Sequence, residues 1–169
     1  EDTIIPPSAK VTGMYVNNSL AKSEAIWRGY DEAIMLTRDG YVSEGSGENV
    51  FLIRDGVLYT PTVTDHILEG LTRNTVMQIA LNDFKIETVE RRILRSEFFV
   101  ADECFLTGTA AHVTPVLEVD GRLIGTGEIG PITARLQEKY FEIVRGVDRK
   151  YADWLTPVVE KVVGAGSIA

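Results

Sequence analysis

Short apolar runs alternate with polar turn residues along most of the chain. Three of the turns are Asp-Gly pairs: Asp39-Gly40, Asp55-Gly56 and Asp120-Gly121. An Asp-Gly pair between two apolar runs is typical of a type I′ hairpin, because both central residues of that turn have positive φ. The pattern predicts three antiparallel hairpins, which join EAIMLT to YVSEG, NVFLI to VLYTP and PVLEV to RLIGTG.

Two of the segments between the hairpins have the spacing of longer helices. The first is predicted over residues 20–28, with Ser19 as its N-cap and Gly29 just after its end. The second is predicted over residues 73–82. Its apolar stripe is formed by Val76, Ile79 and Ala80, which lie at helical spacing with Asp83 one turn further on.

Two more helices are predicted in the second half of the chain. A short one begins at Ser96 and ends near Ala101. A longer one begins near Pro131, a residue favoured in the first turn of a helix. Its core-facing stripe is predicted to consist of residues that recur every four positions, namely Ile132, Leu136, Tyr140 and Val144.

The order of these elements indicates the fold class. Strands come first, helices lie between hairpins, and there is no regular βαβ alternation. We expect an α+β domain built on a curled, mostly antiparallel sheet (a pseudo-barrel) with flanking helices. The segment after Lys10, which contains Gly13 and Tyr15, is predicted to be a further strand.

Composition narrows the functional classes. The 169 residues are 44% apolar and 25% charged, as in ordinary globular domains. The net charge of −8 argues against a nucleic-acid partner. The single cysteine, Cys104, cannot form an internal disulfide and is predicted to be a small core residue. No run approaches the roughly 20 apolar residues of a membrane span, and no signal peptide opens the sequence, so a cytoplasmic location is expected.

Proline and glycine indicate the domain limits. The Pro6-Pro7 pair predicts an extended linker over residues 1–9. The main domain is then expected over residues 10–157. The last part, residues 158–169, is small and Gly-rich at its end and is predicted to be a frayed tail.

Two residues in the first third of the chain could carry chemistry. Lys10 lies between the linker and the following element, although most lysines are solvated surface charges. Glu44 precedes the turn formed by Gly45, Ser46 and Gly47, and a turn carboxylate is the simpler interpretation.

Two later turns could bind an anion. In ILEGLTRNTV, Gly70 allows a tight turn and Thr72 is predicted to cap the next helix, whose first N–H groups form a phosphate site. In LTGTAAHV, a strand ends at Gly108, and the small residues that follow let backbone amides approach a ligand. An ordinary helix cap and an ordinary strand end are the competing interpretations. A lysine, a carboxylate and two anion-binding turns together suit pyridoxal phosphate.

The sequence resembles the branched-chain amino-acid aminotransferases, which are class IV, fold-type IV pyridoxal-phosphate enzymes with the D-amino-acid aminotransferase-like fold. The resemblance is carried by EGSGENVF at residues 44–51, then Leu58 and Thr60, and by LEGLTR at residues 68–73. It continues through PPSAK, GYDEAIMLT, ADECFLTGTAAHVTPV and GPITARLQEKY and covers about nine tenths of the chain.

This resemblance implies roles for individual residues. Lys10 would be the catalytic lysine that holds the cofactor as an imine and moves the substrate Cα proton. Tyr15 would bind the phenolic oxygen, and Glu44 would keep the pyridine nitrogen protonated. The phosphate contacts would be the Leu71 N–H, Thr72 and Thr109.

The resemblance also implies a substrate site. Thr109 and Ala110 lie where family members bind the substrate carboxylate through backbone amides. Glu48 matches the branched-chain type, and we expect it to orient its neighbours through a buried hydrogen bond. His66 and His112 lack the companions of a metal site, so no metal is expected.

The same resemblance implies a partner. Complete members carry an N-terminal domain that supplies an arginine for the phosphate and part of the substrate pocket. The chain is therefore expected to be the cofactor-binding C-terminal domain, inactive alone, of an enzyme that transfers the amino group of Leu, Ile or Val to 2-oxoglutarate. Dimers or higher homo-oligomers are expected. The alternatives are a D-amino-acid transaminase or aminodeoxychorismate lyase of the same fold, and a catalytically silent association domain.

Overall fold

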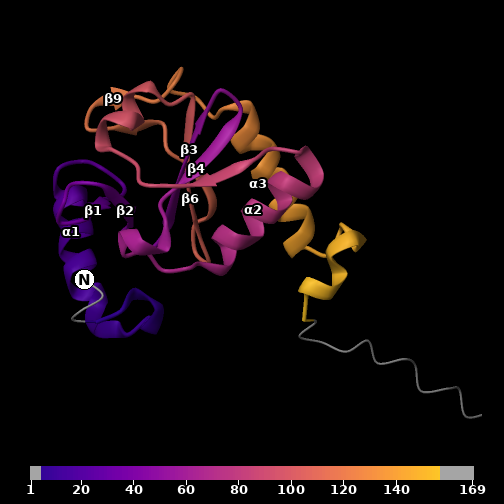
Figure 1. The fold of residues 1–169 in the computed structure, drawn as a ribbon, viewed down its shortest axis with the longest axis horizontal. Helices are drawn as coiled ribbons and strands as arrows, with labels where there is room; N and C mark the ends of the chain where they lie inside the picture. The colour runs from indigo at the N-terminus through magenta and orange to yellow at the C-terminus, as the bar shows by residue number, and fades with distance from the viewer. Residues whose placement is uncertain (1–4, 157–169) are drawn as a thin grey trace, which may run out of the picture.

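A five-stranded sheet forms the centre of the molecule in a computed structural model that describes residues 5–156 (Figure 1). Its strand order is β5-β4-β3-β6-β7. All neighbouring strands are antiparallel except β4 and β5, which are parallel. The strands are β3 (Asn49–Arg54), β4 (Val57–Thr60), β5 (Thr88–Glu90), β6 (Glu103–Gly108) and β7 (His112–Pro115).

Two smaller antiparallel pairs complete the strands of the described residues. One joins β1 (Ile34–Leu36) to β2 (Val42–Gly45), and the other joins β8 (Glu118–Val119) to β9 (Arg122–Leu123). The predicted α+β class with mostly antiparallel strands is confirmed. Within residues 5–156 the sheets do not close into a barrel.

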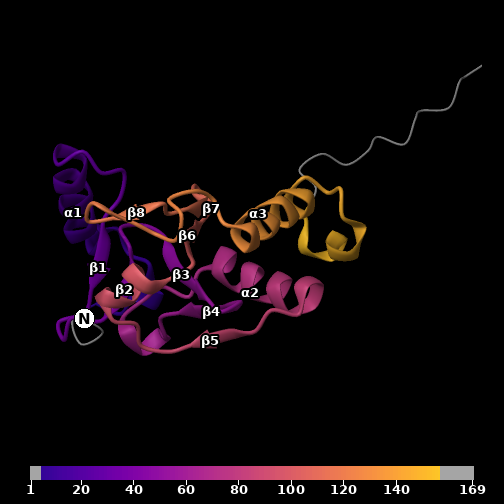
Figure 2. The same ribbon diagram turned by 90° about the horizontal axis from the view of Figure 1, so that it is seen from above.

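Side chains alternate between the two faces of the buried strands, so the central sheet contributes apolar residues to a core cluster on each face. Phe51 and Phe105, whose rings stack 4.8 Å apart, face α2 (Leu71–Phe84) and α3 (Pro131–Val144). These two helices lie side by side (Figures 1 and 2). The opposite face packs against the 3₁₀ helix η4 (Arg95–Val100) and includes Cys104, which is buried as predicted.

All three Asp-Gly hairpins form, but with two kinds of turn. Asp55-Gly56 and Asp120-Gly121 have positive φ at both residues, as a type I′ turn requires. In the first hairpin only Gly40 has positive φ, at 83°. There Thr37 N–H donates to Tyr41 O at 2.7 Å and Gly40 N–H donates to Thr37 O at 2.9 Å, so the loop is longer by one residue than the predicted type I′ turn.

The N-terminal helix differs from its prediction. The 3₁₀ helix η2 (Thr12–Met14) leads directly into α1 (Tyr15–Trp27), so the strand predicted around Gly13 and Tyr15 was wrong. Ser19 lies inside α1 instead of capping it. Gly29, with φ of 88°, follows the end of the helix as predicted.

The later helices begin close to their predicted positions. Residues 96–101 are matched by η4, and α3 begins at Pro131. The buried stripe of α3 differs at its last position, because Ile143 is buried and Val144 is exposed. In α2 the predicted apolar stripe of Val76, Ile79 and Ala80 is buried.

Short 3₁₀ helices occupy three other places. These are η1 (Pro7–Ala9), η3 (Val63–Asp65) and η5 (Arg149–Trp154). The predicted tail, residues 158–169, lies outside the described residues, as do residues 1–4 of the predicted linker. In the part of the chain that is described, no helix combines the length and the apolar character needed to cross a membrane.

Candidate active site

Three glycine-containing turns meet at one end of the central sheet. Asn49 of β3 pairs with Thr107 of β6, which brings the 44–48 turn beside Gly108. A Cβ atom at Gly108 would lie 3.4 Å from Glu48 Cγ, and a Cβ atom at Gly70 would lie 2.2 Å from Asn49 Oδ1. The sheet register therefore places the acidic turn next to both predicted anion-binding turns.

The Glu44 carboxylate is held from one side. Its Oε2 accepts a hydrogen bond from Leu68 N–H at 2.9 Å, and Asn49 Nδ2 reaches the same oxygen at 3.4 Å. Burial raises the pKa of Glu44 to about 7, with a smaller increase from the charge of Glu48. The Leu68 hydrogen bond and the charge of Lys10 act in the opposite direction. Glu44 is thus poised between its acid and its anion near neutral pH.

Lys10 follows η1 and lies just before η2 and α1, and its positive charge lowers the pKa of the Glu44 carboxyl group. The lysine is exposed and has left-handed backbone angles, with φ of 45° and ψ of 41°. Non-glycine residues with positive φ are uncommon, and such strained positions cluster at functional sites.

Tyr15, a partly buried side chain, is the first residue of α1. One turn further on, Asn18 Nδ2 donates to Ser46 O at 2.9 Å, which connects α1 to the Glu44 turn. Further along α1, Lys22 forms an ion pair at 2.7 Å with Glu32, in the segment before β1. The Asn18 contact places the first turn of α1 beside the Glu44 turn.

Helix α2 points its N-terminus at this site. Gly70 is the N-cap residue, and no side chain caps the helix, so the prediction that Thr72 is the cap was wrong. Thr72 is the second residue of the helix and is buried, whereas the Leu71 side chain is exposed. The first intrahelical hydrogen bond at this end runs from Asn74 N–H to Gly70 O. The N–H groups before Asn74 are free of helix partners and lie at the positive end of the helix dipole.

Thr109 and Ala110 form the exposed part of the turn between β6 and β7. The turn ends at His112, which pairs with Gly108 and has a positive φ of 55°. The His112 ring packs edge-on against Phe141, with centroids 5.3 Å apart. His112 thus helps to shape the turn by packing.

Glu48 is half-buried beside Glu44, and its Oε2 accepts from Gly47 N–H at 3.0 Å. Burial and the neighbouring Glu32 raise the pKa of Glu48. Burial alone would also raise the pKa of Glu32, but hydrogen bonds that include the one from Lys22 lower it below its usual value. Glu48 therefore helps to order the turn by accepting the Gly47 N–H.

Sequence reasoning missed two residues of the site. Asn18 and Asn49 both lie in polar stretches near assigned residues, and Asn49 belongs to the EGSGENVF motif itself. Their contacts are with backbone atoms distant in sequence, and only the fold brings those atoms close.

His66, predicted in a loop, follows η3 with φ of 62°. In residues 5–156, no group of three or more His, Cys, Asp or Glu side chains could hold a metal ion.

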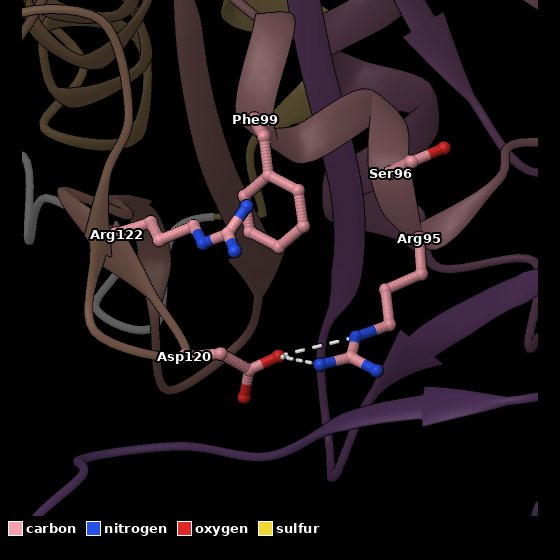
Figure 3. A pocket seen from close by; sticks show the side chains of 5 residues that line it. All are labelled: Arg95, Ser96, Phe99, Asp120 and Arg122. Carbon is pink, nitrogen blue, oxygen red and sulfur yellow. Dashed lines mark hydrogen bonds and ion pairs between the residues drawn. The ribbon is translucent and has the colours of Figure 1, made fainter.

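Two hollows in the surface are lined by other residues than the proposed cofactor contacts. One, of about 870 Å³, is bordered by α1, β1 and β7. The other, of about 420 Å³, is lined by Arg95, Ser96, Phe99, Asp120 and Arg122 (Figure 3). In it Arg95 pairs with Asp120 at 2.7 Å, and the Arg122 guanidinium lies 4.6 Å from the centre of the Phe99 ring. Neither hollow is lined by Lys10, Glu44 or Thr72.

The chain belongs to the class IV aminotransferases. The sequence model of the family described as amino-transferase class IV matches residues 3–119. A probable branched-chain-amino-acid aminotransferase of Aquifex aeolicus (strain VF5) is 57% identical over 161 residues, which are 95% of this chain and 52% of that protein. The branched-chain-amino-acid aminotransferase of Pseudomonas aeruginosa is 55% identical over 89% of this chain and 48% of its own length.

Solved structures show the same relationship. The branched-chain aminotransferase of Thermobaculum terrenum in its PLP-form superimposes with a TM-score of 0.92 at 43% identity, covering 95% of this chain and 52% of that one. A branched-chain aminotransferase of T.th., complexed with N-(5'-phosphopyridoxyl)-L-glutamate, gives 0.89 at 49% identity, covering 92% and 52%. The chain spans about half the length of the relatives it matches.

Proposed function

We propose that the chain is the cofactor-binding half of a pyridoxal-phosphate-dependent branched-chain amino-acid aminotransferase. The observation that carries the proposal is the hydrogen bond that joins the Glu44 carboxylate to Leu68, just before the N-terminus of α2. The charge of Lys10, which lowers the pKa of Glu44, supports it. Relatives at 57% and 55% identity that are named as branched-chain aminotransferases support the substrate class.

The residues present fit pyridoxal phosphate. Both donors to Glu44, Asn49 Nδ2 and the Leu68 N–H, bind its Oε2. The other carboxylate oxygen, Oε1, has no hydrogen-bond partner among residues 5–156 and is not fully buried. Oε1 is therefore free to accept a hydrogen bond from a protonated pyridine nitrogen. The Leu71 and Thr72 N–H groups, with Thr109 from the neighbouring turn, would hold the phosphate.

When bound, the cofactor would supply an electron sink for the carbanion formed at the substrate Cα. Lys10 would carry the cofactor covalently, and once the substrate amine has displaced it, its free Nζ would take the proton from the substrate Cα and release it again within the same half-reaction. Glu44 would keep a proton on the ring nitrogen. Tyr15 would donate a hydrogen bond to the phenolic oxygen, and the amides at Thr109 and Ala110 would bind the substrate carboxylate.

The amino acceptor is proposed to be 2-oxoglutarate, used in ping-pong half-reactions with Leu, Ile or Val. The T.th. relative, whose crystals hold N-(5'-phosphopyridoxyl)-L-glutamate, supports this choice of acceptor. A D-amino-acid transaminase or aminodeoxychorismate lyase would use the same lysine and glutamate. Comparison of L-Leu with D-Ala as donor in the complete protein separates them, and a preference for D-Ala would contradict the branched-chain assignment.

The remaining half of such an enzyme is proposed to come from an N-terminal domain or polypeptide, within a dimer or higher homo-oligomer. The 169-residue chain alone is therefore expected to turn over valine at a negligible rate, because part of the phosphate and substrate shell would be absent. Measurable transamination of valine by the purified chain would contradict this expectation.

Cofactor attachment tests the proposal directly. After incubation with pyridoxal phosphate and borohydride reduction, peptide mapping is expected to find the pyridoxyl group on Lys10. The Lys10→Arg variant should lose this adduct, whereas Lys85→Arg, which changes an exposed lysine after α2, should keep it. A wild-type chain without an adduct on Lys10 would instead indicate the catalytically silent association domain.

A further inference from the structure

We propose that Asn49 is a positioning residue that sets the distance between the ring-nitrogen contact and the phosphate contact. Through one side chain it would hold the Glu44 carboxylate against the start of α2. The inference rests on the proposed function, because it assigns Glu44 and the α2 N-terminus to the two ends of one cofactor.

Asn49 is almost fully buried, with 5% of its surface exposed, at the first position of β3. Its Nδ2 donates to Leu68 O at 2.7 Å and reaches Glu44 Oε2 at 3.4 Å. The same Glu44 oxygen accepts from Leu68 N–H at 2.9 Å. The three residues thus form a closed ring of contacts that joins β2, β3 and the segment before α2.

The other end of the Asn49 side chain contacts the helix start. A Cβ atom at Gly70 would lie 2.2 Å from Asn49 Oδ1, far inside van der Waals contact. The backbone of Gly70, with φ of −68° and ψ of 138°, is open to any L-residue. Glycine is therefore needed here for space, and the space is taken by Asn49.

An amide suits this position better than its isosteres. Both Leu68 O and Glu44 Oε2 are acceptors, so the residue between them must donate. Aspartate would offer only acceptors and add a second negative charge beside Glu44. Leucine would leave Leu68 O without this partner in a partly buried place.

The test compares two probes in the full 169-residue chain. Pyridoxal phosphate and pyridoxal differ only in the phosphate. The dissociation constant of pyridoxal divided by that of pyridoxal phosphate therefore measures how well the phosphate contact is aligned when the ring is bound. Asn49→Asp is expected to weaken pyridoxal phosphate binding by about tenfold or more and to lower this ratio. Asn82→Asp, the same change at an exposed position of α2, should leave both unchanged.

Two further substitutions, Gly70→Ala and Asn49→Ala, test the contact between Asn49 and Gly70 even if the Asn49→Asp variant does not fold. Gly70→Ala is expected to weaken pyridoxal phosphate binding, because its Cβ displaces Asn49. Adding Asn49→Ala should relieve the clash and recover part of the helix alignment, so the effects of the two changes should be clearly non-additive. A purely structural asparagine would lower stability without changing the ratio of the two probes.

The outcomes are distinguishable. If wild type attaches pyridoxal phosphate at Lys10 but the Asn49 variants keep the wild-type ratio, or if Gly70→Ala and Asn49→Ala are additive, the positioning role is wrong and the proposed function stands. If wild type binds neither probe, the proposed function fails, and the positioning role fails with it.

Discussion

Burial of Glu44 favours its neutral form, whereas the proposed contact with a protonated ring nitrogen requires its anion. Burial raises its pKa to about 7, so ionisation at higher pH costs the folded chain free energy. A shift of this size corresponds to about 3 kcal/mol. An ion pair with a protonated ring at about 4 Å, in an effective dielectric near 20, is worth about 4 kcal/mol. Cofactor binding can therefore offset the cost, and the carboxyl group is best tolerated as an anion only when the ring is in place.

Glu44→Gln should stabilise the cofactor-free chain at pH 8 relative to wild type, and less so at pH 5. The sign follows from the raised folded-state pKa. Between the unfolded value of about 4.3 and about 7, the folded chain binds more protons than the unfolded chain, so wild-type stability falls as the pH rises through this window. A neutral amide does not titrate. Urea unfolding at several pH values measures the difference.

Glu69→Gln is the matched control, because Glu69 is an exposed carboxylate just before α2. Its stability difference from wild type should be small and should not follow the Glu44 curve. A Glu44→Gln difference that is independent of pH between 5 and 8 would show that Glu44 is not poised near neutrality.

At the scale of elements, the Glu103 carboxylate connects the sheet to the start of α3. Glu103 begins β6 and is buried. Its two oxygens accept from Ile132 N–H at 3.0 Å and Thr133 N–H at 2.7 Å. These N–H groups lie in the first turn of α3 and have no partner within the helix. Glycine at position 130 leaves room for the carboxylate, since a Cβ there would lie 2.0 Å from Glu103 Cδ.

Glu103→Ala is therefore expected to lower the free energy of unfolding by about 1 to 3 kcal/mol, because two buried donors lose their acceptor. Glu138→Ala, on the exposed side of α3, should change it by less than about 0.5 kcal/mol. Denaturant titration of both variants makes the comparison. Equal losses would mean that the capping contact contributes nothing beyond helix propensity.

Elements with a local signal were predictable from the sequence. The Asp-Gly turns and the start of α3 at Pro131 were found because backbone geometry dictates those residue types. The start of α1 was missed, because this helix buries no residue fully and its apolar positions carry no core-facing pattern. Val144 was preferred to Ile143 because a strict spacing of four drifts away from the 3.6-residue period.

The candidate site was predictable to a similar degree. Lys10 and Glu44 were proposed through the motif that each belongs to, and their roles stay predictions. The contacts of Asn49 could not be predicted, since they depend on the register of β3 with β6 and on the path of residues 66–70. The local sequence around Asn49 reveals neither the strand register nor the path of that segment.

At the scale of the whole molecule, α1 is the least integrated helix of the described part. None of its residues is fully buried, whereas α2 and α3 both contribute to the main core. Its apolar side chains include Leu20 and Trp27, which are 67% and 85% exposed. Yet α1 carries Tyr15 and follows Lys10, so two of the proposed cofactor contacts depend on the most weakly held element.

Amide hydrogen exchange of the cofactor-free chain should reveal this difference. Peptides from α1 are expected to exchange about tenfold or more faster than those from α2, because local opening of α1 breaks few buried contacts. Pyridoxal phosphate should slow exchange in α1, since a ligand held by both Lys10 and Glu44 connects the helix to the sheet. Asn18→Ala, which removes the hydrogen bond to Ser46 O, should speed exchange in α1 and leave α3 unchanged. If α1 is instead as protected as α2 without cofactor, the first turn of α1 is already fixed, and α1 is not the weakly held element inferred from its exposure.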